Sequence, residues 1–224
     1  SRPVPDEPLL DMVSEETADE LRDAGSRREF SRGSFLFHEG DRAGNVYLLL
    51  SGMVKIQTTA ADGRLSVLGF RRGGAVLGEQ STLDGHPMSA SAVALSDTEA
   101  VTIASSRFHE LLEARPDLAR ALLTEMNRRL RASSKLINEL ATADAVTRVA
   151  NRLIDLSGSH GEDPGVQISV SQQDLADWAG LSREAVVRSL RTLRDEGLIE
   201  SGRMAVSITD PLGLQRRALL DTDS

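Results

Sequence analysis

The segment from Val170 to Thr209 constrains the fold of this chain more than any other part of the sequence. It reads VSQQDLADWAGLSREAVVRSLRTLRDEGLIESGRMAVSIT. Ser171 and Ser182 each stand where a helix should begin, because a serine hydroxyl can accept a hydrogen bond from the free amides of a first helical turn. Gly180 falls between the two helices, at a turn where a side chain would obstruct their close crossing. The segment therefore predicts two crossing helices, followed by a hairpin in which LIE and AVSI pair across residues 201–204.

The second of these helices has two chemically different faces. Val186, Leu190 and Leu193 are spaced by four and three and predict a buried stripe. The opposite face carries Arg183, Glu184, Arg188, Arg191 and Arg194. Arginine can bind guanine O6 and N7 with two hydrogen bonds, glutamate can accept from cytosine N4, and the first turns of such a helix reach base edges. The pattern indicates a winged helix-turn-helix that reads DNA. A solvated helix with pairs such as Glu184 and Arg188 is the alternative, and the order of cap, turn glycine, basic face and wing disfavours it.

The charge distribution sharpens this reading. The chain carries a formal charge of −8, which is acidic for a protein that meets nucleic acid. From Val146 to Ser224 there are nine Arg, no Lys and twelve Asp or Glu, a balance of −3, yet residues 183–194 hold four Arg and one Glu. A basic stripe on an acidic body disfavours indiscriminate DNA binding, so specific contacts should carry more of the affinity.

The middle of the chain predicts a β-domain. Between residues 30 and 104 the β-type runs SFLFH, VYLLL, MVKIQTT, LSVLGF, SASAVAL and EAVTIA alternate with glycine turns. Many short strands with regular turns are typical of a sandwich or a jelly-roll barrel. Residues 1–29 are polar, with one helix predicted from Ser14 to Ala24 and capped by Ser14.

Residues 106–141 predict helix, with Pro116 in the first turn of its long part. Its apolar positions keep a heptad, formed by Leu123, Met126, Leu130, Ser133, Ile137 and Leu140. Such a seam most simply pairs with a second copy of the same helix, and packing on the chain's own barrel is the alternative. Asp144 then caps a further helix. The predicted class is α+β, with a β-domain at 1–105, a dimerisation helix and hinge at 106–143, and the DNA-binding domain at 144–224.

The span GEQSTLDGHPMSA, residues 78–90, has the glycines, carboxylate and hydroxyls of a loop that holds an anion. No Lys or Arg occurs from Gly73 to Ser106, so the loop lacks a cation of its own.

From about residue 9 to about residue 210 the chain resembles the cyclic-AMP receptor protein and FNR (Crp/Fnr) family of bacterial transcription regulators. The resemblance rests on FHEGDRAGNVYLLLSGMVKI, on GEQSTLDGHPMSA, on the long helix and on LSREAVVRSL. It implies a homodimer with a jelly-roll effector domain, a central coiled coil and winged helix-turn-helix domains. It also implies that Arg183, Glu184 and Arg188 read bases in an inverted repeat of TGTGA-like half-sites. It places Ser171 and Gln172 near the DNA backbone, and Ala185 replaces a threonine that is frequent in relatives. Ser182 and Arg191 are further candidates for backbone contacts, and for Arg191 and Arg194, which lie further along the helix, contact with phosphate and contact with solvent alone both stay open.

The same resemblance implies an effector pocket with one departure. In relatives that bind cyclic AMP, an arginine before the last Ser/Thr-Ala of the loop pairs with the cyclic phosphate, and Met88 stands there in this chain, before Ser89 and Ala90. The other matching pocket positions are Gly78, Glu79, Arg129, Ser133 and Ser134. Losing one partner of a buried charge pair costs about 3–5 kcal/mol, so we expect that cyclic AMP is not a tight effector. A different small molecule, DNA binding without any effector, and a nucleotide held by Arg71, Arg72, Arg129 or loop amides stay open.

Other classes of function find little support. The chain has no cysteine, which excludes Cys-ligated zinc and iron–sulfur clusters. The histidines, His38, His86, His109 and His160, are isolated, so neither a metal-dependent cupin enzyme nor a haem sensor is favoured. No catalytic residue, metal site or cofactor is assigned. The expected partners are double-stranded DNA, a second copy of the chain and RNA polymerase, in the cytoplasm and without membrane attachment.

Overall fold

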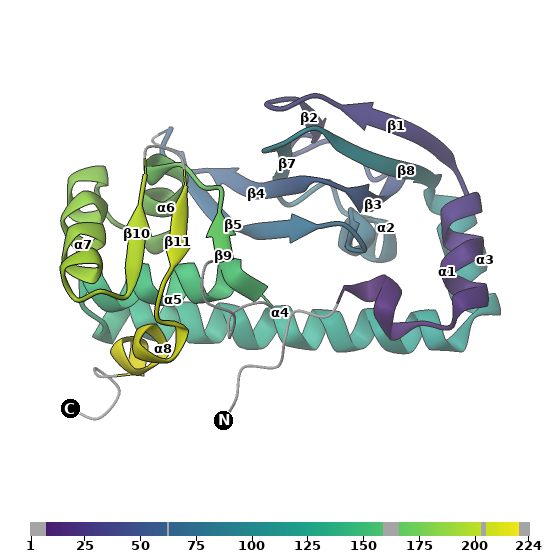
Figure 1. The fold of residues 1–224 in the computed structure, drawn as a ribbon. Helices are drawn as coiled ribbons and strands as arrows, with labels where there is room; N and C mark the ends of the chain where they lie inside the picture. The colour runs from purple at the N-terminus through teal and green to yellow at the C-terminus, as the bar shows by residue number, and fades with distance from the viewer. Residues whose placement is uncertain (1–7, 62, 159–165, 203–204, 220–224) are drawn as a thin grey trace. The chain divides into compact units, whose positions relative to one another are not determined.

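The computed structural model describes residues 8–61, 63–158, 166–202 and 205–219 (Figure 1). They form two compact units that part between Arg129 and Leu130, and we describe each unit by itself. Residues 1–7, Asp62, residues 159–165, Arg203–Met204 and residues 220–224 lie outside the described residues, and with them part of the interval expected to turn the C-terminal hairpin. The domain boundaries expected at 105/106 and 143/144 stay predictions.

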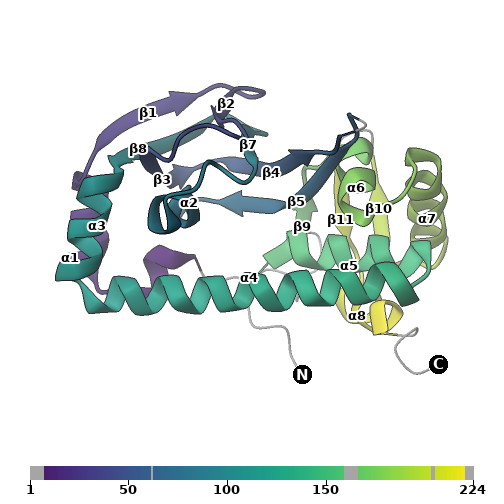
Figure 2. The same cartoon turned by 180° about the vertical axis from the view of Figure 1, so that it is seen from behind.

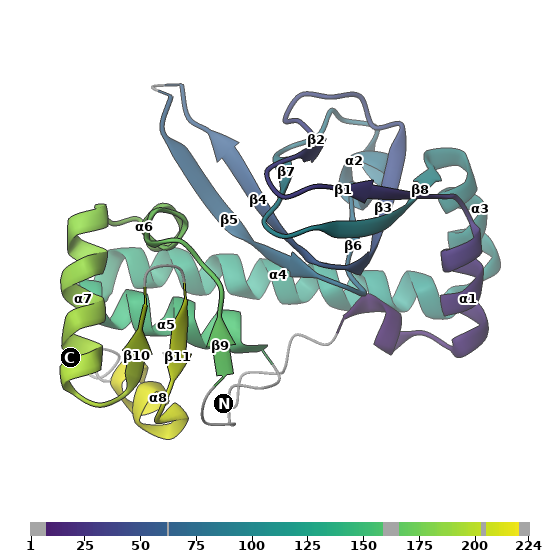
Figure 3. The ribbon, with the colours of Figure 1, turned by 45° about the horizontal axis from the view of Figure 1, so that its top comes forward.

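The first unit is built on two antiparallel four-stranded sheets. One has the order β1-β8-β3-β6, with β1 at Ser26–Phe30, β8 at Thr98–Ala104, β3 at Asn45–Ser51 and β6 at Val76–Leu77. The other has the order β2-β7-β4-β5, with β2 at Phe35–Phe37, β7 at Ser91–Ala94, β4 at Met53–Thr59 and β5 at Leu65–Arg72. Figure 3 shows β4 and β5 running side by side as a long hairpin. The predicted α+β jelly-roll class is confirmed.

Strand β3 explains where the core of this unit lies. Side chains alternate between the faces of a strand, and β3 is buried on both. Val46 and Leu48 belong to one apolar cluster, which includes Phe108 and Leu118 from the helices. Tyr47 and Leu49 belong to a second cluster inside the barrel. The sequence NVYLLLS is therefore an apolar run rather than an alternating one, because both faces are covered.

Helices close this unit at its ends. A short 3-10 helix (η1, Leu9–Met12) precedes α1 at Glu15–Asp23, and Ser14 Oγ accepts from the Thr17 amide at 3.3 Å, as the sequence predicted. The predicted helical stretch is two helices, α3 at Ser105–Ala114 and α4 at Pro116–Thr142. Residues before proline avoid helical backbone, and the break falls at Arg115, so α4 begins at Pro116 as expected.

The second unit holds the C-terminal elements. Helix α5 spans Ala145–Ser157 and is capped by Asp144, whose carboxylate accepts from the Thr147 amide at 2.6 Å. Helices α6 (Gln172–Ala179) and α7 (Arg183–Asp195) follow, and α8 (Pro211–Leu219) ends the described chain. The predicted hairpin is confirmed as β10 (Ile199–Ser201) and β11 (Val206–Ile208), and β9 (Val166–Ile168) adds a third strand beside β11.

Six elements of the described chain were not expected from the sequence, one of them the short 3-10 helix η1. Strand β1 lies mostly in the polar region that follows the helix expected at Ser14–Ala24, and only Phe30 of its residues is buried, so it carries no alternating pattern. Strand β6 has two residues, too few for a pattern. Helix α2, Glu79–Asp84, occupies part of the loop expected to be a turn, and it packs against β3 (Figure 2). Strand β9, which has three residues, and helix α8 were also missed.

Candidate functional site

Helices α6 and α7 form the helix-turn-helix that the sequence predicted. Ser171 Oγ accepts from the Asp174 amide at 3.0 Å and donates to the Asp174 carboxylate at 2.6 Å. Ser182 Oγ accepts from the Ala185 amide at 3.2 Å and starts α7. Gly180 has φ +62°, and a Cβ there would lie 2.9 Å from Leu140 Cδ2. The left-handed backbone of the turn therefore favours glycine, whereas the neighbour of the added Cβ is only the end of a flexible leucine side chain on α4.

Helix α7 separates a buried face from a charged one. Val186, Leu190 and Leu193 are at most 4% exposed, so the predicted stripe is confirmed. Arg183, Glu184 and Arg188 are all exposed on the opposite side. Together with Val187 they line a hollow of about 360 Å³ on this face. The sequence did not single out Val187, although its spacing of four from Arg183 places it on that face.

The groups around Glu184 stabilise the ionised form of its carboxylate. Its own backbone amide and then the Ser182 hydroxyl hydrogen-bond to its carboxylate, and Arg183 and Arg188 lie near, so the pKa of Glu184 is lowered. The carboxylate is thus ionised at neutral pH and can only accept, which suits the N4 amino group of cytosine.

The residues expected near the DNA backbone lie at the starts of α6 and α7 and further along α7. Ser182 is exposed at the start of α7, and Ser171 and Gln172 are half-buried at the start of α6. Arg191 Nε lies 3.7 Å from Asp195 Oδ2, with both side chains largely exposed. Such a surface pair is worth little, so Arg191 can exchange it for a phosphate.

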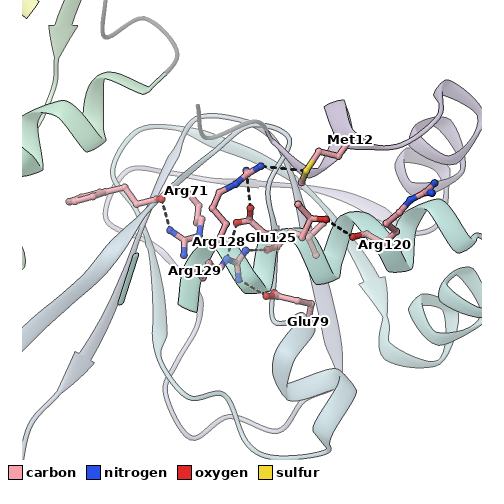
Figure 4. A network of polar contacts seen from close by, with 10 residues as sticks. Met12, Arg71, Glu79, Arg120, Glu125, Arg128 and Arg129 are labelled. Carbon is pink, nitrogen blue, oxygen red and sulfur yellow. Dashed lines mark hydrogen bonds and ion pairs between the residues drawn. The ribbon is translucent and has the colours of Figure 1, made fainter. Parts of the chain in front are cut away.

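The second candidate site is the loop at residues 78–90, in the first unit. Its helix α2 is bounded by two left-handed glycines, Gly78 at φ +79° and Gly85 at φ +72°. Glu79, the first residue of α2, is 2% exposed. Arg129 of α4 donates from Nη1 to Glu79 at 2.5 Å, from Nε to Glu125 at 2.9 Å and from Nη2 to the Val76 carbonyl at 3.3 Å (Figure 4).

In this network the buried carboxylates are neutralised by ion pairs with arginine side chains. Burial opposes the charge on Arg129, but the carboxylates of Glu79 and Glu125 outweigh it and the pKa of Arg129 is raised. Arg128 adds a second ion pair to Glu125 at 3.3 Å, and its other nitrogen lies 3.7 Å from the Met12 sulfur. Glu125 was not expected from the sequence, although its spacing of four from Arg129 is that of a helical ion pair.

Met88 belongs to the core of the barrel. It is 4% exposed and packs in the cluster that contains Tyr47, Leu49 and Leu77. Its amide donates to the Asp41 carbonyl at 2.8 Å, and its carbonyl accepts from Gly40 at 2.8 Å. A Cβ on Gly78 would lie 3.1 Å from Met88 Cε. The methionine therefore fills the space beside Gly78 with apolar atoms.

The positions expected in the effector pocket divide between the two units of the chain. Gly78, Glu79, Met88, Ser89, Ala90 and Arg129 lie in the first unit. Ser133 and Ser134 lie in the second unit, exposed on α4, and Ser134 Oγ donates to the Leu130 carbonyl at 3.1 Å. Their contact with an effector stays a prediction. In the first unit, a hollow of about 360 Å³ lies beside the loop. Met126 and loop residues from Gln80 to Ser89 line it, and none of these residues is Lys or Arg.

Much of the heptad seam on α4 is exposed. Leu123, Leu130 and Ile137 are between 62% and 69% exposed, and Leu140 is 46% exposed. Ser133 is exposed as well, whereas Met126 is half-buried against the core of the first unit. One face of the helix thus presents large apolar side chains to solvent.

Comparisons with known proteins place the chain in a family. Residues 27–115 match the family model of the cyclic nucleotide-binding domain, and residues 147–217 match that of the Crp-like helix-turn-helix domain. The cyclic AMP receptor protein of Thermus thermophilus is 33% identical over 211 residues, 94% of this chain and 96% of that protein. The CRP-like cAMP-activated global transcriptional regulator of Mycobacterium tuberculosis is 31% identical over 194 residues, 85% of this chain and 87% of that protein.

A solved structure shows the same architecture. The c-di-GMP responsive global regulator CLP of Xanthomonas campestris has a TM-score of 0.74 at 27% identity, and the match covers 88% of this chain and 99% of CLP. The chain belongs to the Crp/Fnr family of transcription regulators. It is a DNA-binding regulator with a cyclic nucleotide-binding-type domain, not an enzyme. None of the helices that the described residues form is long and apolar enough to cross a bilayer.

Proposed function

We propose that this protein is a homodimeric regulator that reads an inverted repeat of TGTGA-like half-sites with Arg183, Glu184 and Arg188. The observation that carries the proposal is the face of α7 on which these side chains are exposed around one hollow. The two arginines supply paired donors for guanine, and the ionised Glu184 supplies the acceptor for cytosine N4. Ser171, Gln172, Ser182 and Arg191 hold the DNA backbone and set the register.

A residue that reads a base and a residue that contacts the DNA backbone should affect DNA affinity differently when they are replaced. In a titration against duplexes with single base-pair changes, Glu184→Ala should relax discrimination at one C·G pair, by about 1–3 kcal/mol. Arg191→Ala should weaken all duplexes alike and lower the salt dependence. If Glu184→Ala weakened every duplex equally, Glu184 would not read a base.

We propose that the exposed seam of α4 joins two copies of the chain. Three large apolar side chains that are 62–69% exposed on one helical face are costly in a monomer. Sedimentation of the full chain should give a dimer, and Ile137→Glu should shift it toward a monomer. Asn138→Glu is the matched control, because Asn138 is exposed one residue outside the seam. Equal effects of the two variants would contradict the seam.

We propose further that cyclic AMP is not a tight effector. Met88 brings apolar atoms where cyclic-AMP-binding relatives have an arginine, and Arg129 is already held by two carboxylates. The protein would then bind DNA without an effector or respond to a ligand of another kind. Among its relatives, CLP is described as responsive to c-di-GMP. Calorimetric titration should give no cyclic-AMP affinity in the low micromolar range or better.

A nucleotide-responsive regulator is the second candidate. It is favoured by relatives of 31% and 33% identity that are named for cyclic AMP. The phosphate would then be held by groups other than residue 88, such as Arg71, Arg72 or the amides that begin α2. A tight calorimetric titration would favour this candidate. RNA polymerase stays a predicted partner, to be tested by co-purification on promoter DNA.

A further inference from the structure

One apolar side chain interrupts the charged face of α7. Val187 is 44% exposed, whereas its neighbour Val186 is fully buried. It lines the same hollow as Arg183, Glu184 and Arg188. Residues four apart share one side of a helix, so Val187 follows Arg183 on the outward face and lies beside Arg188. It therefore projects among the base-reading side chains.

This position gives Val187 a defined chemical partner. A duplex that is held by Arg183, Glu184 and Arg188 brings its base edges to the hollow that Val187 lines. The apolar group that a base edge offers in the major groove is the C5-methyl group of thymine. Valine is branched at Cβ and stiff at χ1, so its two methyl groups are presented with little loss of rotamer freedom.

We propose that Val187 contacts the C5-methyl group of a thymine in each half-site. Helix α7 then reads an apolar group in addition to the hydrogen-bonding groups of guanine and cytosine. The inference rests on the proposed reading of DNA by α7 and names a further specificity-determining residue for it. A buried methyl-sized group should contribute about fourfold in affinity per half-site, and about fifteenfold on an inverted repeat.

Deoxyuridine provides a direct test, because replacing thymine by uracil removes only the methyl group and keeps every hydrogen-bonding group. Each thymine of the bound duplex, on both strands, is replaced in turn, and affinity is measured by fluorescence anisotropy at fixed salt. The wild-type chain should lose about fourfold per half-site at one thymine position. Val187→Ala should bind the unmodified and the uracil-containing duplex equally at that position. Val187→Ile keeps the branched methyl group and should retain the discrimination. Position 187 is exposed, so neither variant disturbs the core.

The outcomes separate the inference from the proposed function. Suppose that the TGTGA repeat is bound specifically, but that replacing thymine by uracil changes the affinity at no position, or changes it equally in Val187→Ala. The proposed methyl contact is then wrong, and base reading by α7 stands. If the repeat is bound no better than a scrambled duplex, the proposed half-site is wrong. A duplex is then selected from random DNA by the full chain. The same uracil scan on that duplex shows whether Val187 contacts a thymine methyl group.

Discussion

Arg129 Nη1 lies 2.5 Å from a carboxylate oxygen of Glu79, which is 2% exposed, although the two residues are 50 positions apart in the chain (Figure 4). The same guanidinium also binds Glu125 at 2.9 Å. Two carboxylates therefore hold Arg129 at the start of α2. An anion at this place would have to compete with both of them for Arg129.

The first prediction concerns the stability of the first unit. Arg129→Met should lower its free energy of unfolding by about 3 kcal/mol, because Glu79 is left buried without its partner. Adding Glu79→Gln should recover part of the loss. The single tyrosine of the chain, Tyr47, lies in the core of this unit. Its fluorinated analogue gives one ¹⁹F resonance that reports urea unfolding of this unit alone. A loss below about 1 kcal/mol would show that the pair is screened as surface pairs are.

A second prediction concerns Met88. The Met88→Arg variant should be less stable than the wild type without ligand, because a cation replaces an apolar side chain in the core. Cyclic AMP should stabilise this variant, by about 2.7 kcal/mol at a hundredfold excess over Kd, and should leave the wild type unchanged in a thermal unfolding assay. Met88→Leu conserves volume and is the matched control. Stabilisation of the wild type and of Met88→Leu by cyclic AMP would contradict the account.

A third prediction concerns the second unit. Arg152 Nη2 lies 2.5 Å from Glu139, both residues are less than 9% exposed, and the guanidinium is 4.8 Å from the ring centre of Trp178. Arg152→Met should lower stability by about 1–3 kcal/mol, because the buried Glu139 loses this partner and keeps only the largely exposed Lys135, at 3.4 Å. The chain has one tryptophan, so the fluorescence of Trp178 follows unfolding of this unit. An unchanged urea midpoint would show that the pair contributes nothing to stability.

The fourth prediction is a pH dependence from Asp117. The Ser14 amide, then Thr17 and neighbouring groups, hydrogen-bond to its carboxylate and lower the pKa of Asp117 to about 2 from 3.8. A lowered pKa stabilises the fold above the ordinary value, and this contribution is lost as the pH falls from about 4 to about 2. Asp117→Asn should thus unfold at lower temperature than the wild type near neutral pH, and the gap should close across that window. Asp11→Asn, at an exposed position, serves as the control. A gap that is constant with pH would contradict the assignment.

The sequence predicted the helix-turn-helix well because its determinants are local. The caps at Ser171 and Ser182, the glycine at the turn and the spacing of Val186, Leu190 and Leu193 all lie within one short stretch. Each of these features acts on its immediate neighbours. Strand β1, in contrast, exposes all of its residues except Phe30 and owes its place to pairing with β8, about 70 residues away.

The surroundings of the loop at residues 78–90 were predicted only in part, because they depend on residues that are distant in the chain. The missing arginine at Met88 was visible in the sequence, but the packing of Met88 on Tyr47 and Leu77 depends on strands that are distant in the chain. The ion pair between Arg129 and Glu79 is likewise a long-range contact without a local pattern. Only Glu125, four residues before Arg129, left a periodic sign that could have been recognised.

The most direct test is DNA binding by the full chain on an inverted TGTGA repeat, followed by fluorescence anisotropy at a stated salt concentration, without and with cyclic AMP. The account predicts specific binding, much tighter than to a scrambled duplex, that cyclic AMP leaves unchanged. Weak binding that tightens strongly when cyclic AMP is added would contradict it, because another group would then hold the phosphate in place of the arginine that Met88 replaces.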